Sequence, residues 1–294
     1  MNPSELQSPI DLHLHSTASD GQLTPTALVA LLATRAVRVF ALTDHDTVRG
    51  LDEAAAAATA HGLCMVTGTE LSAEWLGRTV HIVGLGFDPA APVLSALLLR
   101  LAACRAARAG TIAQRLDRAA GPGTAALERA TALAGDDPAR VTRTHLARAL
   151  VELGAAHDME AAFTRWLGHR GRAYVPAGWP ALGEVTTALV AAGGAPVLAH
   201  PLRYTLSSGQ RRRLTQEFKA DGGAAVEVVV GGLASAQRET ATGLALRAGL
   251  AGSVGSDFHD PAFPWNPPGR LAKLPATVVP VWARWAAAQE ALQV

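Results

Sequence analysis

Two histidines near the start of the chain have the spacing of a metal site. Residues 10–21 read IDLHLHSTASDG, in which hydrophobic residues alternate with Asp11, His13 and His15. A β-strand would therefore place both imidazoles on one face, and the Ser-Asp-Gly turn would bring Asp20 back toward them. Imidazole and carboxylate are the ligands that borderline divalent metals take. Because a polar strand face alone explains such a pattern equally well, the metal hypothesis depends on the rest of the chain.

Other residues of ligand type lie in or directly after later predicted strands. They are His45, Glu70, His81, His200, Asp257 and His259. Each one alone has a simpler explanation, such as a loop cap or a buried core histidine. Together they recur at one end of most strands in a predicted parallel sheet, which is where functional residues collect. The pattern therefore favours one shared site.

The hydrophobic pattern predicts alternating strands and helices on both sides of a long helical segment. Strands are predicted over residues 10–15, 37–43, 63–67, 79–86, 195–201, 224–229 and 251–259. Helices are predicted after the cap Thr24-Pro25 and over residues 50–60, 183–192, 208–220 and 234–248. This alternation is typical of an α/β fold, either a parallel barrel or a doubly wound sheet.

The segment from about residue 91 to residue 167 is rich in Ala, Leu and Arg and contains no convincing strand. We interpret it as a helical insertion or cap. The predicted domains are a core formed by residues 1–92 and 178–294, and an insertion formed by residues 93–177.

Composition limits the class of protein and its partners. The 294 residues carry 26 Lys+Arg against 25 Asp+Glu, a net charge of +1, so we expect no stable binding of long DNA. Cys64 and Cys104 are the only cysteines, which predicts a reducing compartment and no disulfide framework. Residues 1–7 lack the pattern of a secretory signal, and no apolar run suits a membrane span. We expect a cytoplasmic protein without an obligate protein partner.

Five ordered motifs resemble those of the PHP (polymerase and histidinol phosphatase) family. They are His-Leu-His at 13–15, Thr-Asp-His-Asp at 43–46, Gly-Thr-Glu at 68–70, Ala-His-Pro at 199–201 and Ser-Asp-Phe-His at 256–259. With Asp20, His81 and the insertion, the chain is similar to small bacterial phosphoesterases that hydrolyse nucleoside 3′,5′-bisphosphates, some of whose relatives trim short RNA from its 5′ end. The resemblance implies an α/β fold, a distorted (β/α)₇ TIM-like barrel with a helical cap.

The same resemblance implies a centre of three divalent metal ions. The first ion would take His13, His15, Glu70 and Asp257. The second would take Glu70, His81 and His200, and the third would take Asp20, His45 and His259. Asp20 stands where some branches of the family have His, which favours harder metals. We therefore expect Mn²⁺ first, with Mg²⁺, Fe²⁺ and Zn²⁺ as alternatives.

The expected reaction is hydrolysis of a phosphate monoester of a small nucleotide. A metal-bridging hydroxide would attack phosphorus in line, with Asp257, Glu70 and His200 as catalytic residues and no covalent intermediate. The most favoured substrate is the 3′-phosphate of a nucleoside 3′,5′-bisphosphate, which would give AMP from 3′-phosphoadenosine 5′-phosphate. The leaving group would receive its proton from a metal-bound water or a nearby side chain, or would be stabilised by a metal directly.

Arginines are expected to bind the phosphate that is not cleaved, because their planar fork donates two hydrogen bonds to phosphate. Arg203, three residues after His200, is the first candidate. The others lie in or after the insertion: Arg143, Arg148, Arg172, His145 and Tyr174. A solvated helix face explains such arginines as well. His61, His157 and His169 are predicted to be surface residues.

Three alternative functions remain open. One is a 5′-3′ exoribonuclease that acts on short 5′-phosphorylated RNA with the same centre. Another is a histidinol-phosphate phosphatase. The third, from a different class, is a non-catalytic metal-binding module, against which the complete set of nine candidate ligands argues.

Overall fold

The computed structural model describes residues 8–119, 121–262 and 266–293, which divide into two compact units. One unit comprises the chain as far as Trp75, Val80–Leu97 and the chain from Pro180 onward. The other comprises Leu76–Thr79 and Leu98–Trp179. The predicted domain boundaries stay predictions, and the absence of a signal pattern concerns residues 1–7, which lie outside the described residues. No helix in the described ranges is long and apolar enough to cross a membrane.

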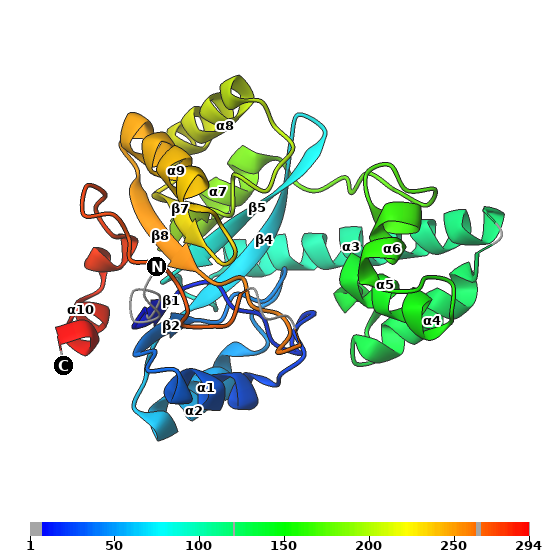
Figure 1. Cartoon of the computed structure of the whole chain (residues 1–294), viewed down its shortest axis with the longest axis horizontal. Coiled ribbons are helices and arrows are strands. Elements are labelled where there is room, and N and C mark those ends of the chain that lie inside the picture. The colour runs from blue at the N-terminus through cyan, green and yellow to red at the C-terminus, as the bar shows by residue number, and fades with distance from the viewer. Residues whose placement is uncertain (1–7, 120, 263–265, 294) are drawn as a thin grey trace. The chain divides into compact units, whose positions relative to one another are not determined.

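The strands of the described chain form two sheets (Figure 1). The first is parallel, in the order β1 (Ile10–Asp11), β2 (Val39–Ala41) and β3 (Cys64–Val66). The second has the order β4 (Gly68–Trp75), β5 (Arg78–Leu85), β6 (Ala195–Leu198), β7 (Ala225–Val230) and β8 (Ala251–Gly255). Within it, β6, β7 and β8 are parallel, whereas β5 and β6 are antiparallel.

The antiparallel pair arises from a hairpin that the sequence analysis did not predict. Residues 68–72 were interpreted as the end of the third strand, but they begin β4. β4 and β5 are joined by Leu76 and Gly77, which have φ values of 49° and 71°. Two central residues with positive φ are typical of the turns that connect adjacent antiparallel strands. The hairpin reverses the chain, so β5 meets β6 in the opposite direction.

The predicted (β/α)₇ TIM-like barrel is confirmed only as an α/β fold, because the described strands form no closed barrel. Single bridges connect residues beside the two sheets: Leu14 pairs with Phe258, and His45 pairs with Glu70. The amide of Leu12 also donates a hydrogen bond to the carbonyl of Val254, at 3.0 Å. The continuous ladders stop where the candidate ligands leave the strands, and irregular backbone takes over there.

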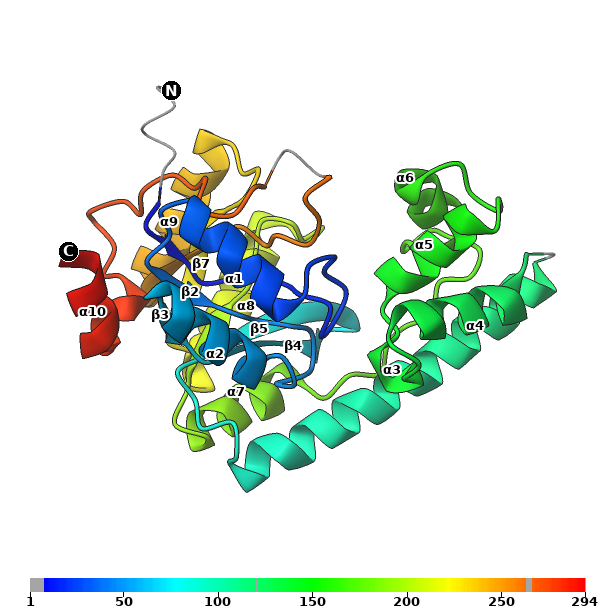
Figure 2. The same ribbon diagram turned by 90° about the horizontal axis from the view of Figure 1, so that it is seen from below.

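Helices cover the sheets of the first unit. They are α1 (Pro25–Thr34), α2 (Leu51–His61), α7 (Leu182–Ala191), α8 (Ser208–Ala220), α9 (Ser235–Ala248) and α10 (Ala286–Gln293). Helix α1 begins as predicted, since the side chain of Thr24 accepts a hydrogen bond from the amide of Ala27. Helices α1 and α2 lie side by side (Figure 2). Hydrophobic residues of the helices and of the strands are buried in the core of this unit, among them Leu28 of α1, Phe40 of β2 and Val226 of β7.

Apart from Leu76–Thr79 at the β4–β5 hairpin, the described residues of the second unit contain helices and no strand. The chain enters it within the 27-residue helix α3 (Pro92–Arg118). It continues through α4 (Gly123–Leu133), α5 (Arg143–Glu152), α6 (Met159–Ala162) and a π-helical turn (Phe163–Leu167). These elements share a separate hydrophobic core that includes Leu116, Leu150 and Trp166. This unit therefore has a hydrophobic core of its own.

Candidate metal centre

Nine side chains of ligand type come together in the first unit. They are His13, His15, Asp20, His45, Glu70, His81, His200, Asp257 and His259. Most leave the chain just after a strand, but Glu70 lies inside β4 and His81 inside β5. Strand β1 ends at Asp11, so its two histidines lie beyond the assigned strand. The structure thus brings together every residue that the sequence analysis assigned as a metal ligand; their role as ligands stays a prediction.

The first group is His13, His15, Glu70 and Asp257, whose ligand atoms all lie within 4.8 Å of one another. The two Nε2 atoms of the histidines are 3.1 Å apart, as the alternation of the segment requires. Glu70 Oε2 lies 3.3 Å from each of these nitrogens. Asp257 Oδ1 lies 3.4 Å from His13 Nε2 and 3.2 Å from His15 Nε2. This group is identical to the ligand set expected for the first ion.

Glu70 joins this group to a second one. Its Oε1 lies 3.0 Å from His81 Nδ1 and 2.9 Å from His200 Nε2, and its Oε2 lies 3.0 Å from His45 Nδ1. The side chain is buried. A carboxylate with both oxygens facing imidazole nitrogens has the geometry of a bridging ligand.

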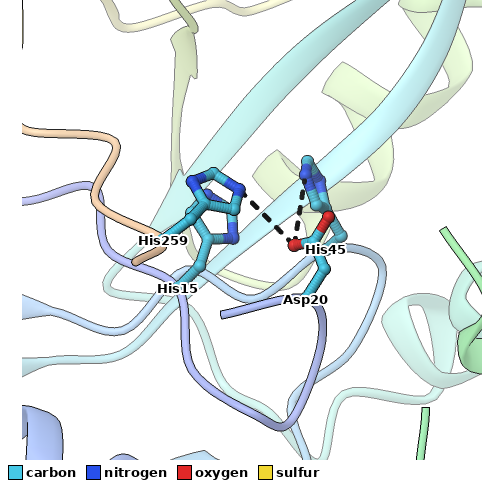
Figure 3. Close-up of side chains that lie close together, drawn as sticks. All are labelled: His15, Asp20, His45 and His259. Atoms are coloured by element: carbon cyan, nitrogen blue, oxygen red, sulfur yellow. Dashed lines mark ion pairs between the residues drawn. The ribbon is translucent and has the colours of Figure 1, made fainter. Parts of the chain in front are cut away.

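A third group contains Asp20, His45 and His259, together with His15 (Figure 3). Asp20 Oδ1 lies 3.4 Å from His259 Nε2 and 3.9 Å from His45 Nε2. The rings of His15 and His259 stack with their centroids 3.9 Å apart. The expected third set lacked His15, and the expected second set lacked His45. The assignment of ligands to individual ions therefore stays a prediction.

Buried polar atoms in the centre fit a bound cation. His45 Nδ1, His81 Nδ1 and Glu70 Oε2 are buried and make no hydrogen bond to any described residue. Buried polar atoms are normally hydrogen-bonded, so a group of unsatisfied nitrogen and oxygen atoms that face one another requires an explanation. Imidazole nitrogen and carboxylate oxygen are both donors to divalent metals. The residues present therefore fit metal ions.

Electrostatics favour positive charge among the carboxylates. Burial acts to raise the pKa of Glu70, but the charges of His13 and His45 outweigh it and hold this pKa well below its ordinary value. Burial acts to lower the pKa of His15, yet its close contacts with the carboxylates of Asp257 and Glu70 prevail and raise it to about 10. For His45, burial prevails and the pKa falls well below its ordinary value. The carboxylates thus remain ionised and attract either protons or metal ions.

Two buried aspartates hold the loops that carry the ligands, and the sequence analysis gave them no role. Asp44 accepts hydrogen bonds from the amide of Ser16 at 2.8 Å and the hydroxyl of Ser19 at 2.6 Å, which fixes the turn before Asp20. Asp11 accepts one from the amide of Ser256 at 2.8 Å, next to Asp257. Asp44 directly precedes His45, and Asp11 lies two residues before His13. This position beside candidate ligands was the feature of the sequence that could have indicated their role.

A third buried carboxylate, Glu227 on β7, contacts His13 directly. It was also missed. The feature of the sequence that could have indicated its role is a single charged residue inside the apolar sequence Val-Glu-Val-Val. Charged residues are rarely buried unless they are paired, so a buried strand with one charge implies a partner for it.

Backbone conformations at the centre are unusual. His200 has a φ of 29° and Asp257 a φ of 55°. Residues other than glycine rarely adopt positive φ, and such conformations cluster at functional sites. The strained backbone turns both side chains toward the centre directly after β6 and β8.

Arg203, the first candidate for phosphate binding, lies beside the centre. Its guanidinium forms an ion pair with Asp257 and donates a hydrogen bond to the carbonyl of Gly231 at 3.0 Å. Its side chain is 38% exposed, so one edge of the fork faces solvent. Tyr204, which the sequence analysis did not single out, accepts a hydrogen bond from the amide of His81 at 2.8 Å.

The other phosphate-binding candidates belong to the second unit: Arg143, His145, Arg148, Arg172 and Tyr174. Arg143 lies near Arg105 and Arg108. Burial, followed by the charge of Arg143, lowers the pKa of Arg108 to about 10. The structure therefore gathers like charges here.

The remaining candidates in this unit make local contacts. His145 is buried, and its Nδ1 accepts a hydrogen bond from the amide of Thr142 at 3.1 Å in the cap of α5. The guanidinium of Arg172 lies 5.9 Å from the ring centroid of Trp166. The carbonyl of Tyr174 accepts a hydrogen bond from Arg115.

The histidines predicted to lie on the surface do so. His61, His157 and His169 are exposed, and none belongs to a group of candidate ligands among the described residues.

Comparison with known proteins agrees with the predicted family. The PHP domain matches residues 11–131. A Haemophilus influenzae protein named 5′-3′ exoribonuclease is 43% identical over 275 residues, which cover 94% of this chain and 98% of the relative. The chain belongs to the PHP family. This confirms the resemblance that the five motifs indicated.

Other PHP relatives extend over the full length of both units. The 3′,5′-nucleoside bisphosphate phosphatase of Chromobacterium violaceum is 41% identical over 273 residues, which cover 93% of this chain and 95% of the relative. A solved structure described as an amidohydrolase from the same species, with bound SO4 and no metal, has a TM-score of 0.88 at 40% identity. It covers 96% of this chain and 97% of its own. The likeness to these relatives therefore extends over the helical unit as well as the first unit.

Proposed function

We propose that this PHP protein is a metal-dependent phosphoesterase that hydrolyses the 3′-phosphate of nucleoside 3′,5′-bisphosphates. The observation that carries the proposal is Glu70, whose two buried oxygens face five imidazole nitrogens. Such a shared carboxylate suits adjacent cations, and adjacent cations suit phosphoryl transfer to water. The name of the Chromobacterium violaceum relative supports the bisphosphate as substrate.

The proposed cofactors are three divalent ions, with Mn²⁺ preferred over Mg²⁺, Fe²⁺ and Zn²⁺. The three overlapping groups of ligand atoms support this number. Bound cations would activate water and neutralise the charge that develops on the phosphoryl oxygens. The proposal also includes a barrel-like arrangement, with the bridges Leu14–Phe258 and His45–Glu70 joining the two sheets.

Exposure indicates from which side the substrate enters. The side chains of His81 and His259 are 21% and 23% exposed, whereas those of His13 and His15 are fully buried. We expect the phosphate to approach from the exposed histidines, where Arg203 also has access to solvent. Arg203 would bind phosphoryl oxygens and keep Asp257 oriented toward the centre.

Arginines of the helical unit are proposed to bind the second phosphate. Arg143 is the strongest candidate, because it shares its surroundings with Arg105 and Arg108. A phosphate would relieve the repulsion between these charges. Arg148, Arg172, His145 and Tyr174 remain weaker candidates on the same unit.

A second candidate function is 5′-3′ exoribonuclease activity on short 5′-phosphorylated RNA. The observation in its favour is the Haemophilus influenzae relative, which carries that name at 43% identity. The same centre would serve both reactions, because each breaks a phosphoric ester bond with water. The two functions differ only in what lies beyond the reacting phosphate.

The test measures phosphate release from 3′-phosphoadenosine 5′-phosphate with Mn²⁺, in parallel with nucleotide release from a 5′-phosphorylated RNA dinucleotide. Histidinol phosphate and a chelator-treated sample complete the set. Metal-dependent formation of AMP from the bisphosphate, faster than cleavage of the dinucleotide, is the expected result. Activity on the dinucleotide alone would assign the protein as an exoribonuclease, and activity on histidinol phosphate alone would refute both.

A further inference from the structure

Glu227 is a charged residue at a position where the fold otherwise places hydrophobic ones. It lies in the middle of β7, between Val226 and Val228, and all three are buried. The register between β7 and β8 shifts directly after it, between Glu227 and Val229. Bulges of this kind redirect side chains and occur next to active sites. The irregular register therefore marks Glu227 as a residue with a specific orientation.

Both oxygens of Glu227 are used, and both contact the metal centre. Oε1 lies 2.7 Å from His13 Nδ1. Oε2 accepts a hydrogen bond of 2.6 Å from the backbone amide of His200. Because a carboxylate oxygen accepts, His13 Nδ1 must carry the hydrogen of this pair. The other ring nitrogen, Nε2, lies 3.3 Å from Glu70 Oε2, on the side where the other candidate ligand atoms gather.

We infer that Glu227 is a positioning residue of the metal centre, acting through two of the candidate ligands at once. It fixes His13 in the Nδ1–H tautomer, which frees Nε2 to bind a cation. It also anchors the backbone of His200, whose φ of 29° is unfavourable and needs a fixed partner. Carboxylates behind metal-binding histidines orient the ring and increase its basicity. The inference rests on the proposed metal centre and extends it beyond its nine ligands.

Strand β8 packs closely against the pair formed by His13 and Glu227. A Cβ atom added to Gly255 on β8 would lie 2.2 Å from His13 Cβ and 2.9 Å from Glu227 Oε1. Glycine at this position lets the backbone of β8 approach both side chains closely. The start of the His13 side chain thus lies against β8, while its ring contacts the Glu227 carboxylate.

The chemistry of this position accepts only a carboxylate. Glutamine has the same shape but offers one acceptor and one donor. If its oxygen accepts from the amide of His200, its NH₂ group faces His13 Nδ1, which must then give up its hydrogen and move it to Nε2. If the amide is reversed, its NH₂ group faces the His200 N–H. Either orientation breaks one of the two contacts, so Glu227→Gln tests the inference with almost no change in volume.

The experiment measures metal affinity in the absence of substrate. Wild-type protein, Glu227→Gln and the control Glu239→Gln compete for Mn²⁺ and Zn²⁺ against a fluorescent chelator. Glu239 is exposed on α9 and serves as a matched substitution. We expect Glu227→Gln to bind metal about 10- to 100-fold more weakly, as is typical when a carboxylate behind a ligand is lost, while the control matches wild type. Wild-type affinity in Glu227→Gln would overturn the inference.

A measurement on the unaltered chain covers the case in which the variant does not fold. Nitrogen-15 NMR of the Zn²⁺-loaded protein distinguishes the two imidazole tautomers. His13 is expected to carry its hydrogen on Nδ1, and a hydrogen on Nε2 would refute the inference. Since neither experiment uses a substrate, a protein that binds metal but does not hydrolyse the bisphosphate would refute the proposed function alone.

Discussion

The metal centre and the arginine cluster gather charge in opposite ways. In the centre, carboxylates lie between imidazole rings, and the two oxygens of Glu70 alone face five imidazole nitrogens. In the helical unit, Arg105, Arg108 and Arg143 come together; burial lowers the pKa values of Arg108 and Arg143, and the charges of neighbouring arginines act in the same direction. Opposite charges stabilise one another, whereas clustered like charges cost folding free energy unless a ligand compensates.

The difference teaches what each cluster is suited to bind. Ionised carboxylates with imidazoles around them offer a site for cations, and the carboxylates of the centre keep depressed pKa values for that reason. Guanidinium groups packed near an aromatic ring, as Arg105 is 5.2 Å from the centroid of Trp179, offer a site for anions.

The largest effect is expected when one carboxylate of the metal centre is replaced by an uncharged side chain. Asp257→Asn keeps the shape of the side chain and tolerates the φ of 55°, because asparagine is among the residues that adopt positive φ. It removes a charge that faces His13 and His15. We expect kcat to fall by at least about a thousandfold, about 4 kcal/mol of transition-state stabilisation, with little change in Tm. The matched change Asp52→Asn, at an exposed position on α2, should leave kcat unchanged; full activity in Asp257→Asn would refute the centre as the reactive site.

After a chelator has removed the metal, the stability of the folded chain should depend on pH, because its folded state binds protons at the centre more tightly than the unfolded chain does. His15 has its pKa raised from 6.5 to about 10 in the folded chain, so its protonation stabilises the fold fully below pH 6.5. This stabilisation is lost as the pH rises toward 10. We expect the Tm of chelator-treated protein to fall between pH 6.5 and 10 and the increase in Tm on adding Mn²⁺ to grow over the same range. A Tm that rises with pH in the chelated sample would contradict this assignment.

Arg203 contacts the metal centre through Asp257 and is expected to contact the phosphate of the substrate as well. Arg203→Met removes the contact with Asp257 and one phosphate donor while keeping an apolar stem. We expect KM for the bisphosphate to rise about tenfold, which corresponds to the loss of a hydrogen bond to a charged group. Steady-state kinetics measure the effect, with Arg212→Met on the exposed face of α8 as the control. An unchanged KM would remove Arg203 from the phosphate site.

The smallest effect is expected at the arginine cluster. Arg143→Met should raise KM for the bisphosphate by about threefold to tenfold, because one of several phosphate donors is lost. It should also raise Tm slightly, because it relieves repulsion with Arg105 and Arg108. The exposed Arg118 of α3 gives the matched control Arg118→Met. If Arg143→Met and Arg118→Met behave alike in both assays, the cluster does not bind substrate.

The candidate ligands were predictable from the sequence because short motifs carry them. His13 and His15 are two residues apart, and Asp257 and His259 are also two apart, so local geometry alone brings each pair to one place. The start of α1 was predicted from its cap Thr24-Pro25, and α8 was predicted over the residues that it occupies, Ser208–Ala220. Local signals of this kind need no knowledge of the fold.

Features that depend on long-range pairing were not predictable in the same way. Glu227 meets His13 across 214 residues, and no local pattern indicates that contact. The β4–β5 hairpin was missed because Glu70 was interpreted as a residue after a strand, whereas it lies within one. The alternation of elements left a parallel barrel or a doubly wound sheet open, and the distorted barrel was implied only by the family resemblance. The direction of β5 depends on the turn at Leu76 and Gly77, which neither signal indicated.

The spread of the centre along the chain has a consequence for the kinetics of folding. Its contacts join segments that lie as far apart as Asp11 and Ser256, which are separated by 245 residues. Contacts of such long range form late, because closing so large a loop is costly before other structure exists. We therefore expect the centre to be completed after the folding transition state, so that bound ions would act on a nearly native chain. Bound metal should then prolong the lifetime of the folded protein by slowing unfolding, and leave the folding rate almost unchanged.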